Sequence, residues 1–206
     1  MFTGIITAIG TVGDAREQGD TRLRIECPYD TARIDIGASI ACSGVCLTVV
    51  ERGSTADGNG WFAVDVSGET RSRTVPGQWT QGRRLNLEQA MRLGDELGGH
   101  IVTGHVDAVG TVAVREERGG SIHMEIDAPA EMAPYIAGKG SITVDGVSLT
   151  VNAVTDLADG TARFALNIIP HTAEVTTLGA LATGDSVNLE IDVLARYLKR
   201  MQALQG

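Results

Sequence analysis

The sequence predicts an all-β fold class: two tandem, homologous, six-stranded antiparallel Greek-key barrels followed by a C-terminal α-helix. Three observations lead to this prediction. The chain repeats itself at a spacing of about a hundred residues. Each copy consists of short segments with period-two alternation, separated by turn residues. The tail carries a helical apolar stripe that has no counterpart in the first copy.

The repeat consists of four sequence blocks that recur in the same order. Thr3-Gly4 recurs as Thr103-Gly104, and three later blocks recur two residues further along. These three are residues 44–49 with 146–151, 62–65 with 164–167, and 85–88 with 187–190. A period of this size indicates a duplicated domain rather than a solenoid. We expect domains at residues 1–97 and 98–191, with residues 192–206 forming the terminal helix.

Each copy supplies about six strand candidates, which is typical of a small closed barrel. Residues 21–26, for example, alternate apolar and polar side chains. A short helical turn is expected after each Phe-Ala strand, near residues 69–74 and 171–176. Gly77 and Gly179 are expected to end these turns.

The tail after Glu190 reads as a helix with one apolar face. The stripe comprises Val193, Leu194, Tyr197, Leu198, Met201 and Leu204. It packs either on the chain's own barrel or on a neighbouring chain. We favour the neighbour, because each barrel should already have a complete core.

The composition excludes several classes of protein. Hydrophobic residues make up 43% and charged residues 21%, which excludes a disordered chain. A net charge of −9 and 4% aromatic residues argue against nucleic-acid binding. No apolar run approaches membrane-spanning length, and the N-terminus lacks the basic region of a signal peptide. Three cysteines are too few for a disulfide scaffold, so we expect a reduced, cytoplasmic protein.

The combined motifs resemble the riboflavin synthase family, of the alpha-chain type with a duplicated lumazine-binding barrel. The resemblance covers nearly the whole chain and depends on the motifs together rather than on any one of them. The matching stretches are residues 1–5, 44–49, 98–100, 103–105, 139–140 and 145–151. The chain departs from many members at Ser43, where they have asparagine.

The resemblance implies a reaction between two molecules of 6,7-dimethyl-8-ribityllumazine. One donates a four-carbon unit to the other, giving riboflavin and 5-amino-6-(D-ribitylamino)uracil, the last step of riboflavin biosynthesis. It further implies a homotrimer in which one subunit's N-terminal barrel faces a neighbour's C-terminal barrel. No cofactor or metal is expected, because the substrate carries the reactive groups. The resemblance leaves open an association with lumazine synthase.

Four residues are candidates for catalysis by this resemblance: Cys46, His105, Ser148 and Asp192. Cys46 aligns with Ser148 between the copies, so two equivalent positions carry a thiol and a hydroxyl. His105 aligns with Ile5, so one barrel has an imidazole where the other has an alkyl group. Three of them also have a structural explanation: Cys46 as a buried core thiol, His105 as a surface-loop histidine, and Asp192 as the cap of the tail helix.

The resemblance also implies a substrate-binding set drawn from equivalent segments of both copies. It comprises Gly4, Ile5, Ile6, Cys46, Leu47, Thr48, Asp65, Val66, Ser67, Gly68, Glu69, Thr70, Gly104, His105, Val106, Lys139, Ser148, Leu149, Thr150, Asn167, Ile168, Ile169, Pro170, His171 and Thr172. Lys139 aligns with Gly37, and a solvated surface charge is its simpler explanation. No role is assigned to His100, and Cys27 and Cys42 are expected to be ordinary small residues.

Two other functions compete with the enzyme. The first is a lumazine- or flavin-binding fluorescent protein of the same fold that catalyses nothing. The chain keeps the Gly-Val-Cys/Ser-Leu-Thr-Val motif in both halves, which favours catalysis. The second is the flavin-binding domain of a reductase, which would need a glycine-rich nucleotide-binding domain that the sequence does not contain.

Overall fold

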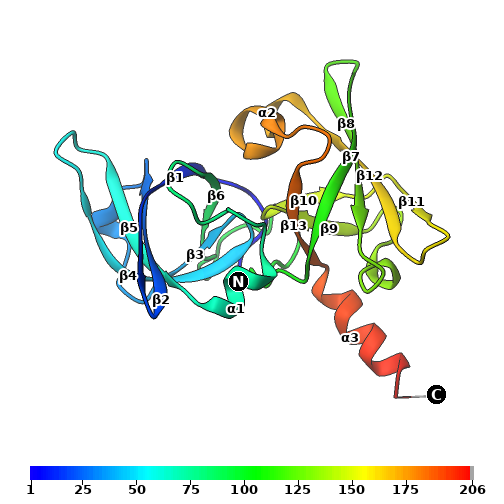
Figure 1. The fold of residues 1–206 in the computed structure, drawn as a ribbon, viewed down its shortest axis with the longest axis horizontal. Helices are drawn as coiled ribbons and strands as arrows, with labels where there is room; N and C mark the ends of the chain where they lie inside the picture. Colours follow the sequence, from blue (N-terminus) through cyan, green and yellow to red (C-terminus); the bar gives the residue numbers. More distant parts are fainter. Residues whose placement is uncertain (205–206) are drawn as a thin grey trace.

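The computed structural model describes residues 1–204 and confirms the predicted architecture. Two barrels lie side by side, and one helix extends from the second (Figure 1). The first barrel contains β1 (Ala8–Gln18), β2 (Asp20–Cys27), η1 (Thr31–Arg33), β3 (Ser39–Cys42), β4 (Val45–Ser54), β5 (Gly60–Val66), α1 (Gly68–Arg73) and β6 (Arg84–Gln89). The second contains β7 (Ala108–Arg118), β8 (Ser121–Ala128), η2 (Ala133–Tyr135), β9 (Ser141–Val144), β10 (Val147–Thr150), β11 (Ala153–Asp156), β12 (Ala162–Ile168), α2 (Pro170–Val175), η3 (Thr177–Ala180) and β13 (Ser186–Ile191).

The first barrel is closed, with strand order β1-β2-β5-β4-β3-β6 and β6 paired back to β1. Because β2 pairs with β5 rather than with β3, the chain makes a Greek-key crossing. The alternation in β2 works as the sequence predicts: Leu23, Ile25 and Cys27 point into the core, with partly exposed side chains between them. Because β6 pairs back to β1, this sheet has no terminal strand with a fully unpaired edge.

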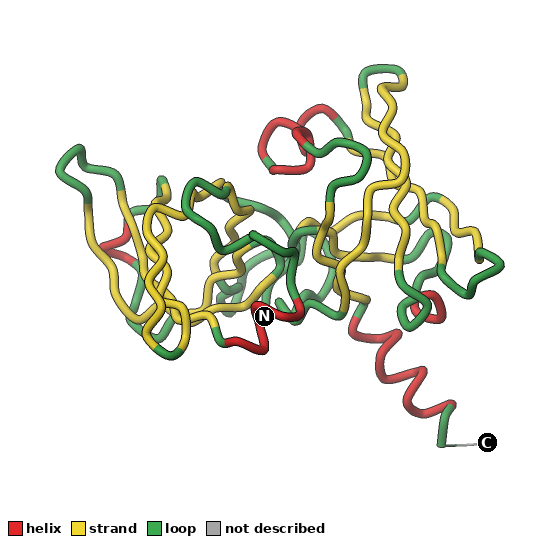
Figure 2. The backbone as a smooth tube through the Cα atoms, in the orientation of Figure 1, coloured by secondary structure: helices red, strands yellow, loops and turns green. Residues whose placement is uncertain are grey.

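The second barrel follows the same order but has one strand more than predicted. The strand equivalent to β4 is divided into β10 and β11, which form the two ends of a seven-stranded sheet. Residues 151–152 join them, and Val151 and Asn152 donate backbone hydrogen bonds to Gly140 and Ala165 on either side. The strand equivalent to β4 is therefore interrupted, but its neighbours in the sheet stay the same as in the first barrel. Strands alternate with loops similarly in both halves (Figure 2).

The short helices α1 and α2 lie where the sequence places them, but the prediction of their ends is wrong. Thr74 and Thr176 terminate them in extended conformation, and their hydroxyls donate to the carbonyls of Thr70 and Thr172. Gly77 lies beyond the end of α1, in a later turn. Each helix therefore ends through a side-chain contact, without a left-handed glycine cap.

The tail helix α3 (Val193–Gln202) is shorter than the predicted segment, and residues 205–206 lie outside the described chain. Asp192 caps it, as expected, by accepting a hydrogen bond from the Leu194 N–H. Arg196 forms a bidentate ion pair with Asp107 at 2.7 and 2.9 Å. This pair ties the base of the helix to the second barrel, while Tyr197 and Leu198 are 64% and 60% exposed. No helix in residues 1–204 has the length and apolar character to cross a membrane.

The two barrels meet at a buried polar interface near a local two-fold axis. The Asn86 amide donates to the Asp145 carbonyl, and the Asn188 amide donates to the Ser43 carbonyl. Ser43 and Asp145 occupy equivalent turns and both have positive φ, of 45° and 46°. Asparagine and aspartate adopt this left-handed conformation more readily than most residues, which suits Asp145. The repeated Leu/Val-Asn-Leu-Glu block thus supplies one inter-barrel asparagine from each copy.

Asp145 is only 6% exposed, and its burial generates a prediction about stability. Burial raises the pKa of its carboxyl to about 7, against the opposing effects of the Asn188 N–H and the Arg83 charge. Because folding raises this pKa, the folded state binds the proton more tightly than the unfolded state. The contribution of Asp145 to stability is therefore fully present below its unfolded pKa and is lost as the pH rises through 7.

We predict that the free energy of unfolding falls by about 2 kcal/mol between about pH 5 and pH 7. Asp145→Asn should remove most of this slope, because asparagine keeps the acceptor for the Asn188 N–H and has no proton to lose. Urea unfolding at several pH values measures it. Asp57→Asn, at an exposed turn, is the control and should keep the slope. An unchanged slope in Asp145→Asn would contradict the assignment.

Candidate functional site

The first barrel has a gap in its hydrogen-bonded wall where β4 and β5 stop pairing. Their ladder ends at the Val49–Val64 pair. Beyond it, residues 46–48 pair only with β3, and residues 65–66 pair only with β2. We call this opening, between residues 46–48 and 65–70, the first wall gap.

The second barrel has an equivalent opening. Pairing between β11 and β12 begins at Ala153–Ala165, while β10 stays paired with β9. Residues 148–150 and 167–172 form its two sides, which we call the second wall gap. The predicted binding segments of both copies therefore flank equivalent openings.

Two short segments, which we call straps, cross from each barrel to the other. The first strap is residues 3–6 and the second is residues 103–106. They start from an antiparallel bridge in which Phe2 and Val102 exchange backbone hydrogen bonds of 2.8 and 3.0 Å. The first strap then runs to the second barrel, where Ile6 packs on the core. The second runs to the first barrel, where Val106 packs on the core.

By sequence, His105 belongs to the second copy and Ile5 to the first, but the crossing brings each residue to the opposite barrel. The Gly104 carbonyl accepts a 2.8 Å hydrogen bond from the Cys46 N–H. His105, the next residue, therefore belongs with Cys46 at the first wall gap. The Gly4 carbonyl likewise accepts from the Ser148 N–H at 2.8 Å, which places Ile5 at the second.

The close approach of the straps explains two glycines. Gly4 and Gly104 both have φ of +77°. A Cβ at Gly4 would lie 2.5 Å from the Ser148 Cβ, and one at Gly104 would lie 2.7 Å from the Cys46 Cβ. Any side chain would push the strap away from the residue that it contacts.

The second wall gap contains a polar cluster that the sequence reasoning missed. The His100 Nδ1 lies 2.7 Å from the Ser148 Oγ, and its Nε2 lies 3.3 Å from the Thr143 Oγ1. Burial lowers the pKa of His100, and the charge of Asp192 partly offsets this. A neutral imidazole thus has both nitrogens next to hydroxyls, one as donor and one as acceptor. Two sequence features pointed to His100: the Gly-Gly-His stretch at residues 98–100 and the His-Ile-Val-Thr-Gly-His run that follows.

The first wall gap presents a thiol. Cys46 is partly exposed, whereas Cys27 and Cys42 are buried in the first core. Burial raises the pKa of both buried thiols, as expected for cysteines that pack in a core. No hydrogen bond in the described chain joins Cys46 or His105 to the Ser148 cluster. Of the four candidates for catalysis, Cys46 and His105 therefore lie at the first gap and Ser148 at the second, while Asp192 caps α3.

The loops beside the two gaps differ in polarity. The Ser67 Oγ accepts from the Thr70 N–H and lies 3.0 Å from its hydroxyl, so Ser67 caps α1. Its counterpart Ile169 makes no side-chain cap and is 51% exposed. Asp65 is engaged by Arg22 at 2.5 and 3.0 Å. At this position the first gap therefore has a polar cap residue, whereas the second gap has an exposed apolar side chain.

Lys139 lies at the rim of the second barrel in a strained conformation. Its φ is +66°, where its counterpart Gly37 has +90°. Both donate their N–H to equivalent carbonyls, of Val151 and Val49. A lysine in the left-handed region costs about 1 kcal/mol relative to glycine, so this side chain is kept at a cost to stability.

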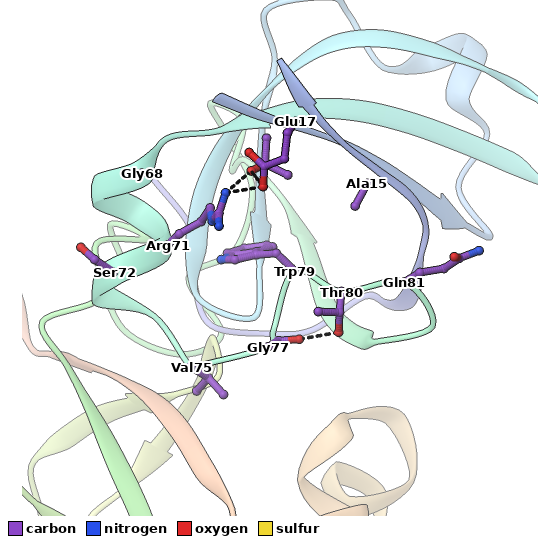
Figure 3. A pocket seen from close by; sticks show the side chains of 11 residues that line it. Ala15, Glu17, Gly68, Arg71, Ser72, Val75, Gly77, Trp79, Thr80 and Gln81 are labelled. Carbon is purple, nitrogen blue, oxygen red and sulfur yellow. Dashed lines mark hydrogen bonds and ion pairs between the residues drawn. The ribbon is translucent and has the colours of Figure 1, made fainter. Parts of the chain in front are cut away.

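A cavity of about 750 Å³ lies between α1, β1 and the turn at residues 75–81, and it borders the first wall gap at Gly68 (Figure 3). Arg71 spans it to reach Glu17 and Thr21, and the Trp79 indole forms one wall. Of the predicted binding residues, only Gly68 lines it. In residues 1–204, no three His, Cys, Asp or Glu side chains are grouped to hold a metal ion.

Comparison with known proteins identifies relatives along the whole chain. The lumazine binding domain family matches twice, over residues 3–90 and 103–192. The riboflavin synthase of Brucella abortus is 47% identical, with all of both chains covered. That of Mycobacterium tuberculosis is 46% identical over the same share. That of Bacillus subtilis is 35% identical, covering 97% of this chain and 89% of the relative.

Among solved structures, LumP complexed with riboflavin has a similar fold. Its TM-score is 0.75 at 23% identity, and the match covers 93% of this chain and 99% of LumP. At this identity the likeness supports the tandem-barrel fold.

The strain at Lys139 generates a prediction. Lys139→Gly should raise the free energy of unfolding by about 1 kcal/mol, because glycine adopts positive φ without a steric penalty. Gly37→Ala is the reciprocal variant and should lower it by about the same amount. Thermal and urea unfolding measure both. A destabilised Lys139→Gly would mean that packing of the lysine stem outweighs the strain.

Proposed function

The chain belongs to the riboflavin synthase family, and we propose that its two wall gaps are the two substrate sites of that reaction. Each gap takes one 6,7-dimethyl-8-ribityllumazine. A four-carbon unit passes from one molecule to the other, leaving riboflavin and 5-amino-6-(D-ribitylamino)uracil. The observation that carries the proposal is the duplicated gap, because two equivalent openings suit a reaction that consumes two identical molecules.

The protein's main contribution is to hold two rings in reactive register, which can supply much of the rate acceleration. The remainder is proton transfer to and from the acidic C7 methyl group. At the first gap, Cys46 and His105 would contact the ring system. At the second, Ser148 would do so, with Asp192 beside it. Here His100 is a positioning residue, since its ring nitrogen lies 2.7 Å from the Ser148 Oγ.

The two gaps of one chain open at separate barrels, so we place the reaction between subunits of a homotrimer. The exposed stripe of α3 supports this, since Leu194, Tyr197 and Leu198 are all at least 60% exposed. An isolated helix of this length is only marginally stable without a partner. We place the protein in the cytoplasm, where three free thiols stay reduced. An association with lumazine synthase remains a prediction.

The first experiment mixes metal-free protein with 6,7-dimethyl-8-ribityllumazine and follows riboflavin by absorbance. We expect turnover with one riboflavin formed per two lumazines consumed. His105→Ala should lower kcat by about a hundredfold or more, the usual contribution of a proton-transfer group. His123→Ala, on the outer face of β8, is the matched control and should keep full activity. Binding without riboflavin formation would identify a lumazine carrier instead.

The trimer generates a separate prediction. Light scattering should give three chains per particle for the unaltered protein. Leu198→Glu places a charge in the apolar stripe and should give monomers with little activity, because each site would lose its partner barrel. Lys199→Glu, one position off the stripe, should stay trimeric. A monomeric protein that turns over at full rate would refute the inter-subunit site.

A further inference from the structure

Glu190 is a buried carboxylate at the end of the repeated block, and it binds the second strap. It is 2% exposed. Its Oε1 accepts from the Thr103 N–H at 2.7 Å and from the Thr103 hydroxyl at 2.6 Å. Its Oε2 accepts from the N–H groups of Gly104 and His105 at 3.0 and 3.2 Å. Four donors thus converge on one side chain of β13.

Glu88 has the equivalent role in the first copy. It is 5% exposed. Its Oε1 accepts from the Thr3 N–H and hydroxyl at 2.7 and 2.8 Å, and its Oε2 accepts from the Gly4 N–H at 2.9 Å. Both carboxylates therefore bind a strap, and both straps lead to the opposite barrel.

We propose that Glu88 and Glu190 are positioning residues that each control the site of the other barrel. Glu190 belongs to the second barrel but fixes the strap whose Gly104 carbonyl binds the Cys46 N–H. Glu88 belongs to the first barrel but fixes the strap whose Gly4 carbonyl binds the Ser148 N–H. The inference rests on the proposed function only in treating these two places as substrate sites.

The chemistry of the carboxylate explains why glutamate is needed. Burial raises the pKa of both carboxyls, but each contact that their oxygens make is with a donor on the strap, so both oxygens act as acceptors. Glutamine of the same shape would turn an amide NH₂ toward N–H groups, leaving buried donors facing each other. The substitution should therefore loosen the strap while leaving the shape of the core unchanged.

Thiol reactivity tests the crossed control directly. Cys46 serves as the reporter of the first gap, with iodoacetamide labelling followed by mass spectrometry and buried Cys27 and Cys42 as internal references. A C46S/S148C background places the reporter at the second gap. Glu190→Gln should speed labelling at position 46 about tenfold, the effect of losing a charged hydrogen bond, and leave position 148 unchanged. Glu88→Gln should do the reverse.

Milder variants keep the test valid if the glutamine variants fold poorly. Thr103→Val and Thr3→Val each remove one hydroxyl donor, and they should give the same crossed pattern with smaller changes. Equal acceleration of both reporters by either variant would show general destabilisation and overturn the proposal, as would no acceleration of either. Labelling does not depend on turnover, so an inactive wild-type protein with a crossed pattern would refute the proposed function alone.

Discussion

The exchange of straps between the barrels is the constraint on which the rest of the site depends. It begins with one antiparallel bridge, between Phe2 and Val102, which lies on the local two-fold axis of the duplicated chain. From there each strap is bound by a glutamate of its own barrel and then packs on the core of the opposite barrel. Each wall gap is therefore completed by a segment from the other half of the sequence, and neither barrel forms a whole site by itself.

The polar interface between the barrels holds this exchange in register. Asn86 and Asn188 each bond to a backbone carbonyl in the opposite turn, so the barrels cannot slide without breaking buried hydrogen bonds. Apolar contacts of the same buried area would fix the relative orientation of the two barrels less strictly, because they are not directional. The block that supplies these asparagines also supplies Glu88 and Glu190. One repeated motif thus fixes both the angle between the barrels and the path of the straps.

Much of the fold could be predicted because it is encoded locally. Period-two alternation marked strands such as β2, and internal alignment paired Cys46 with Ser148. The barrel that His105 contacts could not be predicted, because the internal alignment shows which positions of the two copies are equivalent. It does not show which barrel a segment packs against. The cluster around His100 was missed for a similar reason: Thr143 and Ser148 approach it only through tertiary packing.

Duplication provides two equivalent sites, and the differences between them give each its own chemistry. The Gly4 and Gly104 carbonyls accept hydrogen bonds from equivalent N–H groups, those of Ser148 and Cys46, so both gaps have the same backbone arrangement. The side chains on this arrangement differ: Cys46 and His105 lie at one gap, and a hydroxyl beside a buried histidine lies at the other. Under the proposed function, one lumazine gives a four-carbon unit and the other receives it. The shared backbone arrangement would then bind the common ring, and the differing side chains would determine which molecule gains or loses a proton. A perfectly symmetric chain could bind both molecules but would give neither a distinct role.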